Sequence, residues 1–594
     1  MWGRINVRRN LSIAASYLLL AVICYWSAWS NHPSHTTLAG ADQFQNAWNL
    51  TWIPYAVLHL HNPFHTQYLN YPSGANLLTN TSAPMLGLIA SPITLLFGPI
   101  AAFNAMLTLG MAGSACTTYV LARKFVAWRP AAYVGGLIFG FSPYVIGHGV
   151  GQLNLEFVAF IPLIFLVLYE IVVVHHDSYM KWGLLLAGIL LAQFFTSSEL
   201  LIDTSVVVLI AMIVLAISNR RSLNQYLPTI ARTFAVAIGG FIVVAAWPIW
   251  FALHGAGHIS GPVQLVPQAY RADLFGSFVP DGLQHFGPPA SMLAQANLFA
   301  SNPVENGSYL GIPLLLLLGI GTLAYRRSKA VLFAALMGTV AFVLSMGAGL
   351  VIRVKPDAAG SGIWLPEKLL SKLPLLSNII PVRFTMIEDL FAAVLVALLL
   401  CLLNESLKDH ELSGVVQVAV PAVVAVASIL PLIPAVPYSG MVSTAPPEVF
   451  SSRAAAIFPN GSTAVVFPYP VGLNQDATLW QADTFMRFKM PGGNLFVPDR
   501  STGKVAYSGT FGYTQPTTIG TAFLDLSTGV DPPNSFSFRN SVLTQLFRWK
   551  VRTLVAVPSL APNPQQVVSY ISWLTGGSSP NKVGTAYIWH LPRR

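Results

Sequence analysis

Charged residues are scarce in this chain. They make up 9% of its 594 residues, against about 25% in an ordinary soluble protein. Hydrophobic residues make up 54%, and the mean hydropathy is +0.59. This composition excludes a soluble globular enzyme, a disordered chain and a coiled coil. Long apolar runs recur along the first three-quarters of the sequence, so we expect an α-helical polytopic membrane protein.

Cysteine is also rare, and several common motifs are missing. The three cysteines, Cys24, Cys116 and Cys401, lie in apolar segments and give neither a disulfide framework nor a CxxC metal signature. The absence of a P-loop, a Rossmann glycine pattern, HExxH and GxSxG argues against ATP-driven transport and serine hydrolysis. The net charge is +10, but its Lys and Arg form no single patch, so we expect no nucleic-acid partner.

About eleven apolar runs predict transmembrane helices. The first, near 11–30, follows three arginines and has no clear small-x-small cleavage site, so we interpret it as a retained span rather than a signal peptide. The segment 84–97 is interrupted by prolines, and we expect an interfacial helix there instead. The other ten predicted spans lie near 100–122, 131–147, 157–174, 182–197, 203–218, 230–253, 309–325, 331–350, 384–403 and 414–437.

Basic residues predict the orientation. With the N-terminus inside, the cytoplasmic segments hold fourteen Lys and Arg and the outer loops between spans hold six. This is the positive-inside bias of a multi-pass membrane protein. We therefore expect a cytoplasmic N-terminus and an extracytoplasmic C-terminus.

The same count divides the chain into two predicted domains. Residues 1–437 form a transmembrane domain with a long first outer loop at 31–99, and residues 438–594 form one extracytoplasmic soluble domain. The soluble domain is expected to be mixed α/β. Its β-like runs lie at 464–467, 551–557 and 585–590, and its helical pattern lies at 566–574.

The first outer loop carries one acid, Asp42, and no Lys or Arg. A lone carboxylate beside a membrane surface is partly desolvated and has no cation near it in sequence, which makes it a better proton acceptor. Asp42 would equally serve as the N-cap of a helix at 43–58. The two interpretations are compatible, and we take Asp42 as the candidate general base.

The loop also holds five histidines, which raise the question of a metal. His59, His61 and His65 have a spacing that could bind one. Pro63 interrupts the helix that would align His61 with His65, and no carboxylate lies near them in sequence. We therefore expect no metal and no other cofactor.

Polar residues at other outer span ends are further candidates. His148, Gln152 and Asn154 share one loop, while Glu199 and Asp203 are spaced to lie on one helix face. An ionisable group at a span end in an uncharged region is a functional candidate by default. The alternative is that these side chains simply face water.

The outer loop at 351–383 is basic. Arg383 precedes the tenth predicted span, where a forked guanidinium could bind a phosphate at headgroup depth. Arg271 and Lys372 are candidates for the same task. Contact with ordinary anionic lipid is the alternative for Arg383.

Four stretches, together with this topology, resemble a known superfamily. They are Asn-Tyr-Pro-Ser-Gly-Ala-Asn at 70–76, Gly-Gln-Leu-Asn at 151–154, residues 374–384 ending in Pro-Val-Arg-Phe, and Phe-Met-Arg-Phe-Lys-Met-Pro-Gly-Gly at 485–493. The chain resembles the GT-C membrane glycosyltransferases, and within them an uncharacterised actinobacterial group. The resemblance in architecture covers the whole chain. The adjacent acidic pair of some relatives is half kept, because Asp42 is followed by Gln43.

The resemblance implies an activity. A sugar would pass from a polyprenyl-phosphate donor to an envelope glycan, lipid or protein on the outer face, with inversion and with Asp42 as the base. Arg383, Arg271 and Lys372 would hold the donor phosphate. The residues implied in substrate binding are His148, Gln152, Asn154, Glu199, Asp203 and, in the C-terminal domain, Trp480 and Arg487.

Two alternatives stay open. A transporter or flippase of a lipid-linked glycan would show ionisable residues at mid-span and two paired halves. Glu170 and the pair Glu388-Asp389 lie toward span ends, and no internal repeat is evident. A non-catalytic envelope-assembly protein on the same fold is compatible with the half-kept acidic pair.

Overall fold

A computed structural model provides the structure, and its described residues fall into two compact units. One comprises residues 1–30, 105–245 and 264–441, and the other comprises 31–104, 246–263 and 442–594. We call them the membrane unit and the loop unit. The described residues are 7–40, 42–218, 220–264, 266–280, 282–287, 289, 304–305, 307–352, 362–373, 376–451, 454–471, 474–508, 510–511 and 515–591.

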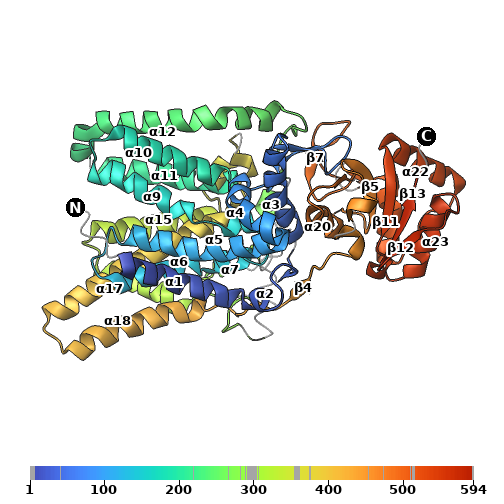
Figure 1. Ribbon diagram of the computed structural model, residues 1–594. Coiled ribbons are helices and arrows are strands. Elements are labelled where there is room, and N and C mark those ends of the chain that lie inside the picture. The colour runs from blue at the N-terminus through green and yellow to red at the C-terminus, as the bar shows by residue number, and fades with distance from the viewer. Residues whose placement is uncertain are drawn as a thin grey trace. The chain divides into compact units, whose positions relative to one another are not determined.

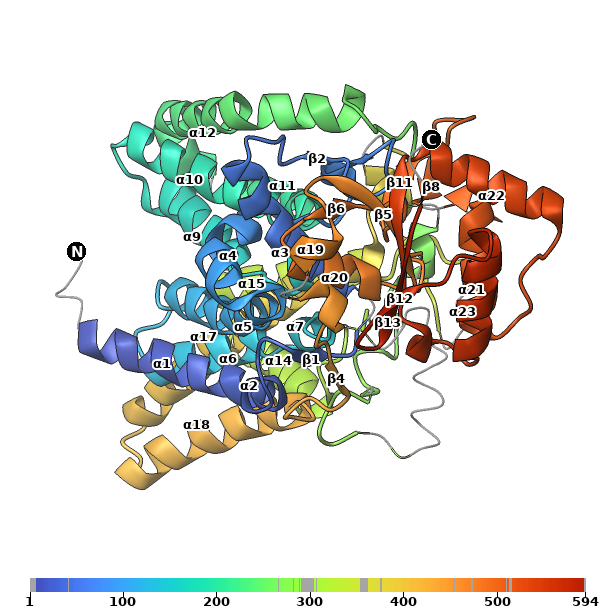
Figure 2. The same ribbon diagram turned by 45° about the vertical axis from the view of Figure 1, so that its right-hand side comes forward.

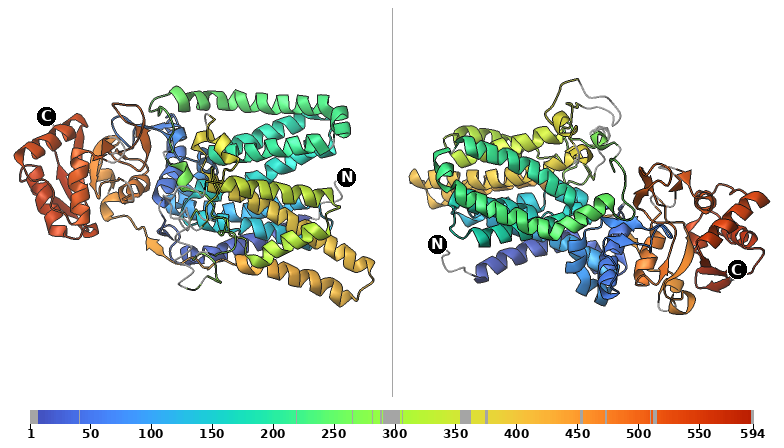
Figure 3. Two further views of the ribbon diagram at one scale, coloured as in Figure 1. Left: turned by 180° about the vertical axis from the view of Figure 1, so that it is seen from behind. Right: turned by 90° about the horizontal axis from the view of Figure 1, so that it is seen from above.

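The membrane unit is helical. Its helices α9, α10, α11 and α12 lie side by side with roughly parallel axes (Figures 1 and 3). The helices that build it, some reaching into the loop unit, are α1 (Val7–Cys24), α2 (Trp26–Ser30), α5 (Pro99–Ala122), α6 (Arg129–Gly140), α7 (Pro143–His148), α8 (Leu153–Glu156), α9 (Phe160–Tyr169), α10 (Tyr179–Phe194), α11 (Ser198–Ser218), α12 (Arg220–His254), α14 (Ile312–Ala324), α15 (Lys329–Ser345), α16 (Glu367–Leu370), α17 (Thr385–Asp409) and α18 (Gly414–Ile429).

Among the described residues, seven helices are long and apolar enough to cross a membrane. They are Pro99–Ala122, Arg129–His148, Leu153–Val174, Ser198–Ser218, Gln225–His254, Pro381–Asp409 and Gly414–Leu432. Three shorter apolar helices, α10, α14 and α15, fall on runs that the sequence also predicts to be spans. The prediction of a polytopic helical membrane protein is confirmed.

Helix α17 is the centre of this unit. Eighteen of its twenty-five residues are buried, as expected for a helix that is apolar on every side. It packs against α6 and α15. A side chain at Gly135 of α6 would meet the Ala393 carbonyl oxygen at 3.0 Å, so glycine permits the close approach of the two helices.

The loop unit contains a five-stranded mixed sheet in the order β12-β13-β11-β5-β6. β5 (Ser462–Phe467) pairs in parallel with β11 (Val551–Ala556) and β6 (Phe488–Lys489), while β13 (Ala586–His590) runs antiparallel to β11 and to β12 (Asn581–Val583). The β-like runs predicted at 464–467, 551–557 and 585–590 are β5, β11 and β13. The mixed α/β fold of this region is therefore confirmed.

The side chains on the two faces of the sheet pack into two different hydrophobic cores. Val465 and Leu554 point into one core, and Val466 and Val555 point into the other, as the two-residue period of a strand requires. One face is covered by α21 (Thr518–Thr528), α22 (Phe536–Arg548) and α23 (Pro564–Leu574), which Figure 2 shows beside β11 to β13.

The other face packs against elements of the first outer loop. α3 (Gln43–Leu58) buries most of its residues and contacts α4 (Pro84–Phe97) and α20 (Asp476–Asp483). Trp48 Nε1 donates to Gln481 Oε1 at 2.6 Å. The sequence places the loop at 31–99 in the transmembrane domain, whereas in the structure residues 31–104 cluster with 442–594.

The remaining short elements complete the two units. α4 begins and ends where the interfacial helix is expected. The others are β1 (Thr36–Leu38), β2 (His65–Thr66), β3 (Ala75–Asn76), β4 (Met441–Ser443), α19 (Ala454–Ile457), β7 (Phe496–Pro498), β8 (Val505–Tyr507), β9 (Thr510–Phe511) and β10 (Gln515–Pro516), with single turns of 3₁₀ or π-helix between them.

Candidate functional site

The membrane unit holds a buried cluster of charged side chains. Arg383, in the turn before α17, forms ion pairs with Glu199 at the start of α11 and with Glu305, whose Oε1 is 3.5 Å from the Arg383 guanidinium. The side chains of Arg383 and Glu305 are 8% and 6% exposed, and that of Glu199 is 26% exposed. Glu199 therefore forms the open side of this group, which we call the buried charge cluster.

His148 is the fourth member of the buried charge cluster. Its Nδ1 lies 2.8 Å from the Tyr144 carbonyl oxygen and its Nε2 lies 3.3 Å from Glu305 Oε2. Both ring nitrogens thus face oxygen acceptors. His148 therefore links the end of α7 to Glu305 within the buried charge cluster.

The surroundings of Glu305 lower the pKa of its carboxyl. Burial raises the pKa of its carboxyl, but the Arg383 charge and the hydrogen bond from His148 outweigh burial and lower the pKa to about 2. Gln152 Nε2 adds a contact at 3.5 Å to Glu305 Oε1. The carboxylate is therefore held ionised by three groups from two other segments of the chain.

The other predicted residues of the membrane unit lie in several places. Asp203 is fully buried one turn along α11 from Glu199, with no hydrogen-bond partner for its carboxylate among the described residues. Asn154 is buried in α8. Arg271 is buried beside Gly347, and its neighbour Tyr270 accepts a hydrogen bond from Val382 at 3.1 Å. Lys372 is exposed after α16.

Asp42 lies in the loop unit at the N-cap of α3. Its backbone carbonyl accepts from the Asn46 amide at 2.9 Å and from Asn46 Nδ2 at 3.0 Å, but its side chain makes no capping hydrogen bond. The carboxylate is half-buried. Asp42 therefore occupies the N-cap position that the capping interpretation predicts, but its carboxylate does not make the capping hydrogen bond.

Trp480 and Arg487 lie within the packed part of the loop unit. Trp480 is 5% exposed and stacks on Phe450 with ring centroids 4.9 Å apart. Arg487 Nε donates to the Phe458 carbonyl oxygen at 2.8 Å. Both side chains thus have clear structural contacts.

The histidines of the first loop do not gather into a metal site. The rings of His59, His61 and Tyr55 stack on one another, and the Tyr68 ring is tilted against His61. Across the described ranges, no group of three or more His, Cys, Asp or Glu side chains has the geometry to hold a metal ion.

Sequence reasoning missed Glu305 and Tyr144. The rule that selects Glu199, an acid beside a span in a poorly charged region, applies equally to Glu305, which precedes α14 by a few residues. No local signal pairs Glu305 with Arg383, because the two are far apart in the chain. Tyr144 contacts the buried charge cluster through its backbone carbonyl, which accepts from His148, and any residue at this position would supply that group.

Comparison with solved structures shows the fold. The apo oligosaccharyltransferase of Archaeoglobus fulgidus is similar at 13% identity and a TM-score of 0.49, over 93% of this chain and 70% of that one. A mutant mycobacterial arabinofuranosyltransferase AftD is similar at 14% identity and a TM-score of 0.51, over 94% of this chain and 37% of that one. ArnT from Cupriavidus metallidurans bound to undecaprenyl phosphate is similar at 12% identity and a TM-score of 0.43, over 98% of this chain and 97% of that one.

The likeness to AftD places this chain among proteins with the GT-C fold, as the sequence resemblance implies. No curated protein matches the sequence. One family model does, over residues 13–375, and its description is a domain of unknown function, DUF6311. Because that match covers more than half of the chain, the protein belongs to the DUF6311 family.

Proposed function

We propose that this protein is a membrane glycosyltransferase that moves a sugar from a polyprenyl-phosphate donor to an envelope acceptor outside the bacterial plasma membrane. The observation that carries the proposal is Asp42 in a chain of GT-C fold. It stands half-buried at the N-cap position of a buried helix in the first outer loop. A carboxylate is a residue type that can act as a general base, and Asp42 is our candidate for that role.

In the proposed reaction, Asp42 takes the proton of an acceptor hydroxyl. The hydroxyl oxygen then forms a bond to the anomeric carbon while the bond from that carbon to the phosphate oxygen breaks. Polyprenyl phosphate leaves with the electron pair, and the configuration inverts in this single displacement. No nucleotide is needed for the step, because the donor already carries its phosphate leaving group.

We assign the donor phosphate to Arg383, with Arg271 and Lys372 as further cations. Arg383 is already paired, so an incoming phosphate would have to replace a carboxylate. Glu199 is the more exposed of its two partners, and we propose that the phosphate takes its place. The guanidinium would then stabilise the negative charge that develops on the leaving group. His148, Gln152, Asn154 and Asp203 would orient the donor sugar.

The experiment is a turnover assay on purified protein in lipid discs. A panel of polyprenyl-phosphate sugars is supplied with a cell-envelope extract as acceptor, and the release of polyprenyl phosphate is measured. Loss of a positioned general base lowers the rate about 10²–10⁴-fold, and we expect this for Asp42→Asn. The control is Asp177→Asn, an exposed aspartate, which should keep full activity.

Release that does not depend on Asp42 would remove it from the mechanism. Folded protein that releases nothing from any donor would contradict the proposal and favour a lipid-glycan transporter or a non-catalytic assembly protein. The buried acids within candidate spans, Glu156, Asp203, Glu388 and Asp389, would then be the first residues to test for transport. A phosphatase fusion at the C-terminus tests the orientation, because it is active only outside the cytoplasm.

A further inference from the structure

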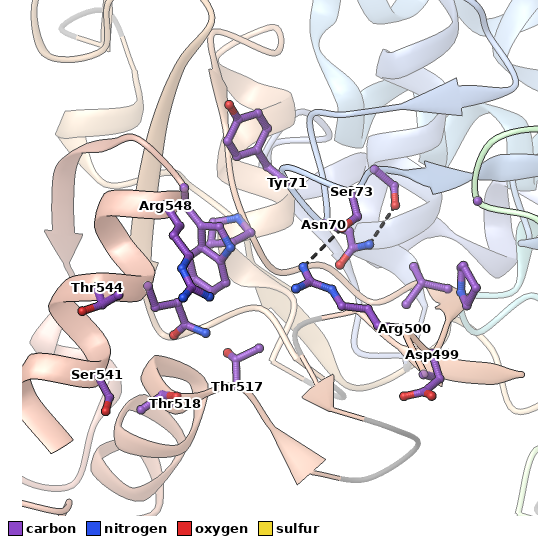
Figure 4. Close-up of a pocket in the computed structure, with 18 of the residues that line it drawn as sticks. Asn70, Tyr71, Ser73, Asp499, Arg500, Thr517, Thr518, Ser541, Thr544 and Arg548 are labelled. Carbon is purple, nitrogen blue, oxygen red and sulfur yellow. Dashed lines mark hydrogen bonds between the residues drawn. The ribbon is translucent and has the colours of Figure 1, made fainter. Parts of the chain in front are cut away.

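The loop unit contains a cavity of about 890 Å³ that the proposed chemistry does not use. Its walls come mainly from residues 70–74, the hairpin of β7 and β8, the start of α21, and α22 with Trp549. Gly257 and Pro491 complete the lining. Figure 4 shows the side chains that line it. All of the lining residues belong to the same compact unit.

Two of the four stretches behind the superfamily resemblance meet at this cavity. The Asn70 amide donates to the Gly492 carbonyl at 2.9 Å, and the Tyr71 amide donates to the Met490 carbonyl at 3.1 Å. Residues 70–76 and 485–493 thus run side by side, and each supplies lining residues. Gly74 turns the first stretch with φ +73°, where an added Cβ would lie 2.4 Å from the Thr66 carbonyl oxygen.

One face of α22 forms the opposite wall. Ser537, Ser541, Thr544 and Arg548 recur at the spacing of a helix face. The other face of α22 carries Val542 and Leu546, which are buried in the core, so the register of the helix is fixed. These four residues are exposed, and the space that they border is the cavity.

The charge within the cavity is positive and uncompensated. Arg500 and Arg548 extend from opposite walls toward the same space (Figure 4), and neither forms an ion pair in the part of the chain that the structure describes. Arg500 Nη2 donates only a long hydrogen bond, at 3.3 Å, to Ser73 Oγ. Two guanidinium groups that face each other repel unless an anion lies between them.

The nearby acid does not neutralise them. Asp499 Oδ1 accepts hydrogen bonds from the amides and hydroxyls of Ser501 and Thr502. These bonds lower the pKa of the Asp499 carboxyl below its ordinary value, and they hold it in its own turn. In Figure 4 it points away from the two arginines.

We propose that this cavity binds an acidic saccharide, and that this saccharide is the acceptor of the transfer. The arginines match the carboxylate or phosphate of an acidic sugar through forked donors. The hydroxyls of Thr517, Thr518 and Ser541 and the amide of Asn540 match sugar hydroxyls, and Trp549 and Tyr71 add apolar surface. The volume lies in the range of small-molecule sites. The acceptor role rests on the proposed function, whereas saccharide binding does not.

This assignment moves acceptor recognition away from the residues that the sequence favours. Trp480 is buried in the loop unit and Arg487 is half-buried and bonded to the Phe458 carbonyl, while Arg500 and Arg548 are exposed in the cavity. Both cavity arginines lie in segments with no distinctive local pattern, and only the fold brings them together.

The test measures binding to the full-length protein in phosphatidylcholine discs, with Asp42→Asn as the background so that no turnover interferes. The probes are an oligogalacturonate of six residues and, as its neutral counterpart, maltohexaose. We expect the acidic probe to bind, and the double variant Arg500→Gln with Arg548→Gln to weaken its binding by more than about tenfold, because two charge-assisted contacts are lost. Arg552→Gln, an exposed arginine outside the cavity, should change it less than about twofold.

If the double variant bound each probe as tightly as the parent protein does, the role of the arginines would be overturned. Binding of maltohexaose alone would overturn the acidic class, and binding of neither probe would overturn the proposal. The double variant Arg500→Lys with Arg548→Lys should keep part of the affinity, which would show that the loss in the glutamine variant is one of charge and not of folding. Because the readout is binding, these outcomes are independent of whether polyprenyl phosphate is ever released.

Discussion

The buried charge cluster and the cavity of the loop unit use the same residue type in opposite ways. Arg383 is 8% exposed and is paired with two carboxylates, whereas Arg500 and Arg548 are exposed and lack ion pairs among the described residues. Charges removed from water must be compensated by the protein itself. Exposed charges that are left unpaired at a cavity are available to a ligand. Substitutions should therefore separate stability from binding in the two regions.

The largest effect is expected from Arg383→Met. It leaves Glu199 and Glu305 without their common cation, and breaking a buried pair costs about 3–5 kcal/mol of stability. Thermal unfolding in detergent measures the loss, and Arg326→Met, an exposed arginine after α14, is the control. Adding Glu199→Gln and Glu305→Gln to Arg383→Met should recover most of the stability. No recovery in the triple variant would show that Arg383 stabilises the fold by packing rather than by charge.

The next effect is a pH dependence from Glu305. Its pKa is lowered from 4.5 to about 2, so the ionised carboxylate stabilises the fold at pH values above the unfolded pKa. That stabilisation is lost as the pH falls from about 4.5 to 2 and corresponds to about 3 kcal/mol. Glu305→Gln should be less stable than the parent protein at pH 6, with a difference that shrinks toward pH 2. A difference that is constant with pH would contradict the ion-pair assignment.

A smaller effect of opposite sign is expected at Asp483 in the loop unit. Burial raises the pKa of Asp483 to about 7, and its Oδ2 has no hydrogen-bond partner in the described parts of the chain. Because the pKa of this acid is higher in the folded than in the unfolded protein, the folded protein loses stability as the pH rises from about 4 to about 7. Asp483→Asn should therefore be more stable at pH 8, by about 1–2 kcal/mol after allowance for partial exposure, and equal at pH 4. Chemical denaturation of the parent protein and the variant at the two pH values measures the difference in free energy of unfolding. No gain in stability at pH 8 would contradict the prediction.

The smallest effect on stability is expected in the cavity. Arg500→Gln with Arg548→Gln removes two exposed, unpaired charges, and such changes usually stay within about 0.5 kcal/mol. Unfolding at low and high salt checks this. At low salt the double variant should equal or slightly exceed the parent protein, because a repulsion is relieved. A loss above about 2 kcal/mol would mean that the arginines hold the fold together.

Patterns with a local cause are visible in the sequence. Short β-like runs predict β5, β11 and β13, and apolar runs predict the helical membrane unit. The prolines predict an interfacial helix at 84–97, where the structure has α4 (Pro84–Phe97). The rule for acids at span ends selects Glu199, which the structure places against Arg383. These features depend on neighbouring residues only.

Features that depend on distant partners are not visible. The bond from the Gln45 amide to Gln475 Oε1 joins the first outer loop to the C-terminal region across most of the chain, and no periodicity reports it. The same holds for Glu305 beside Arg383 and for residues 70–74 and α22, which line the same cavity. Trp480 was expected in a binding site, but its ring contributes to the core, since an aromatic residue suits either place.

The most direct test compares the two regions in one assay. Release of polyprenyl phosphate is measured with and without an acidic acceptor for the wild type, for Asp42→Asn and for the variant with Arg500→Gln and Arg548→Gln. Without the acceptor, water attacks the anomeric carbon in place of the acceptor hydroxyl and gives its proton to Asp42. The account predicts that Asp42→Asn lowers release about 10²–10⁴-fold under both conditions. It predicts that the arginine variant raises the KM for the acceptor and leaves release to water unchanged. Full release by Asp42→Asn would contradict the central claim that this loop carboxylate is the catalytic base.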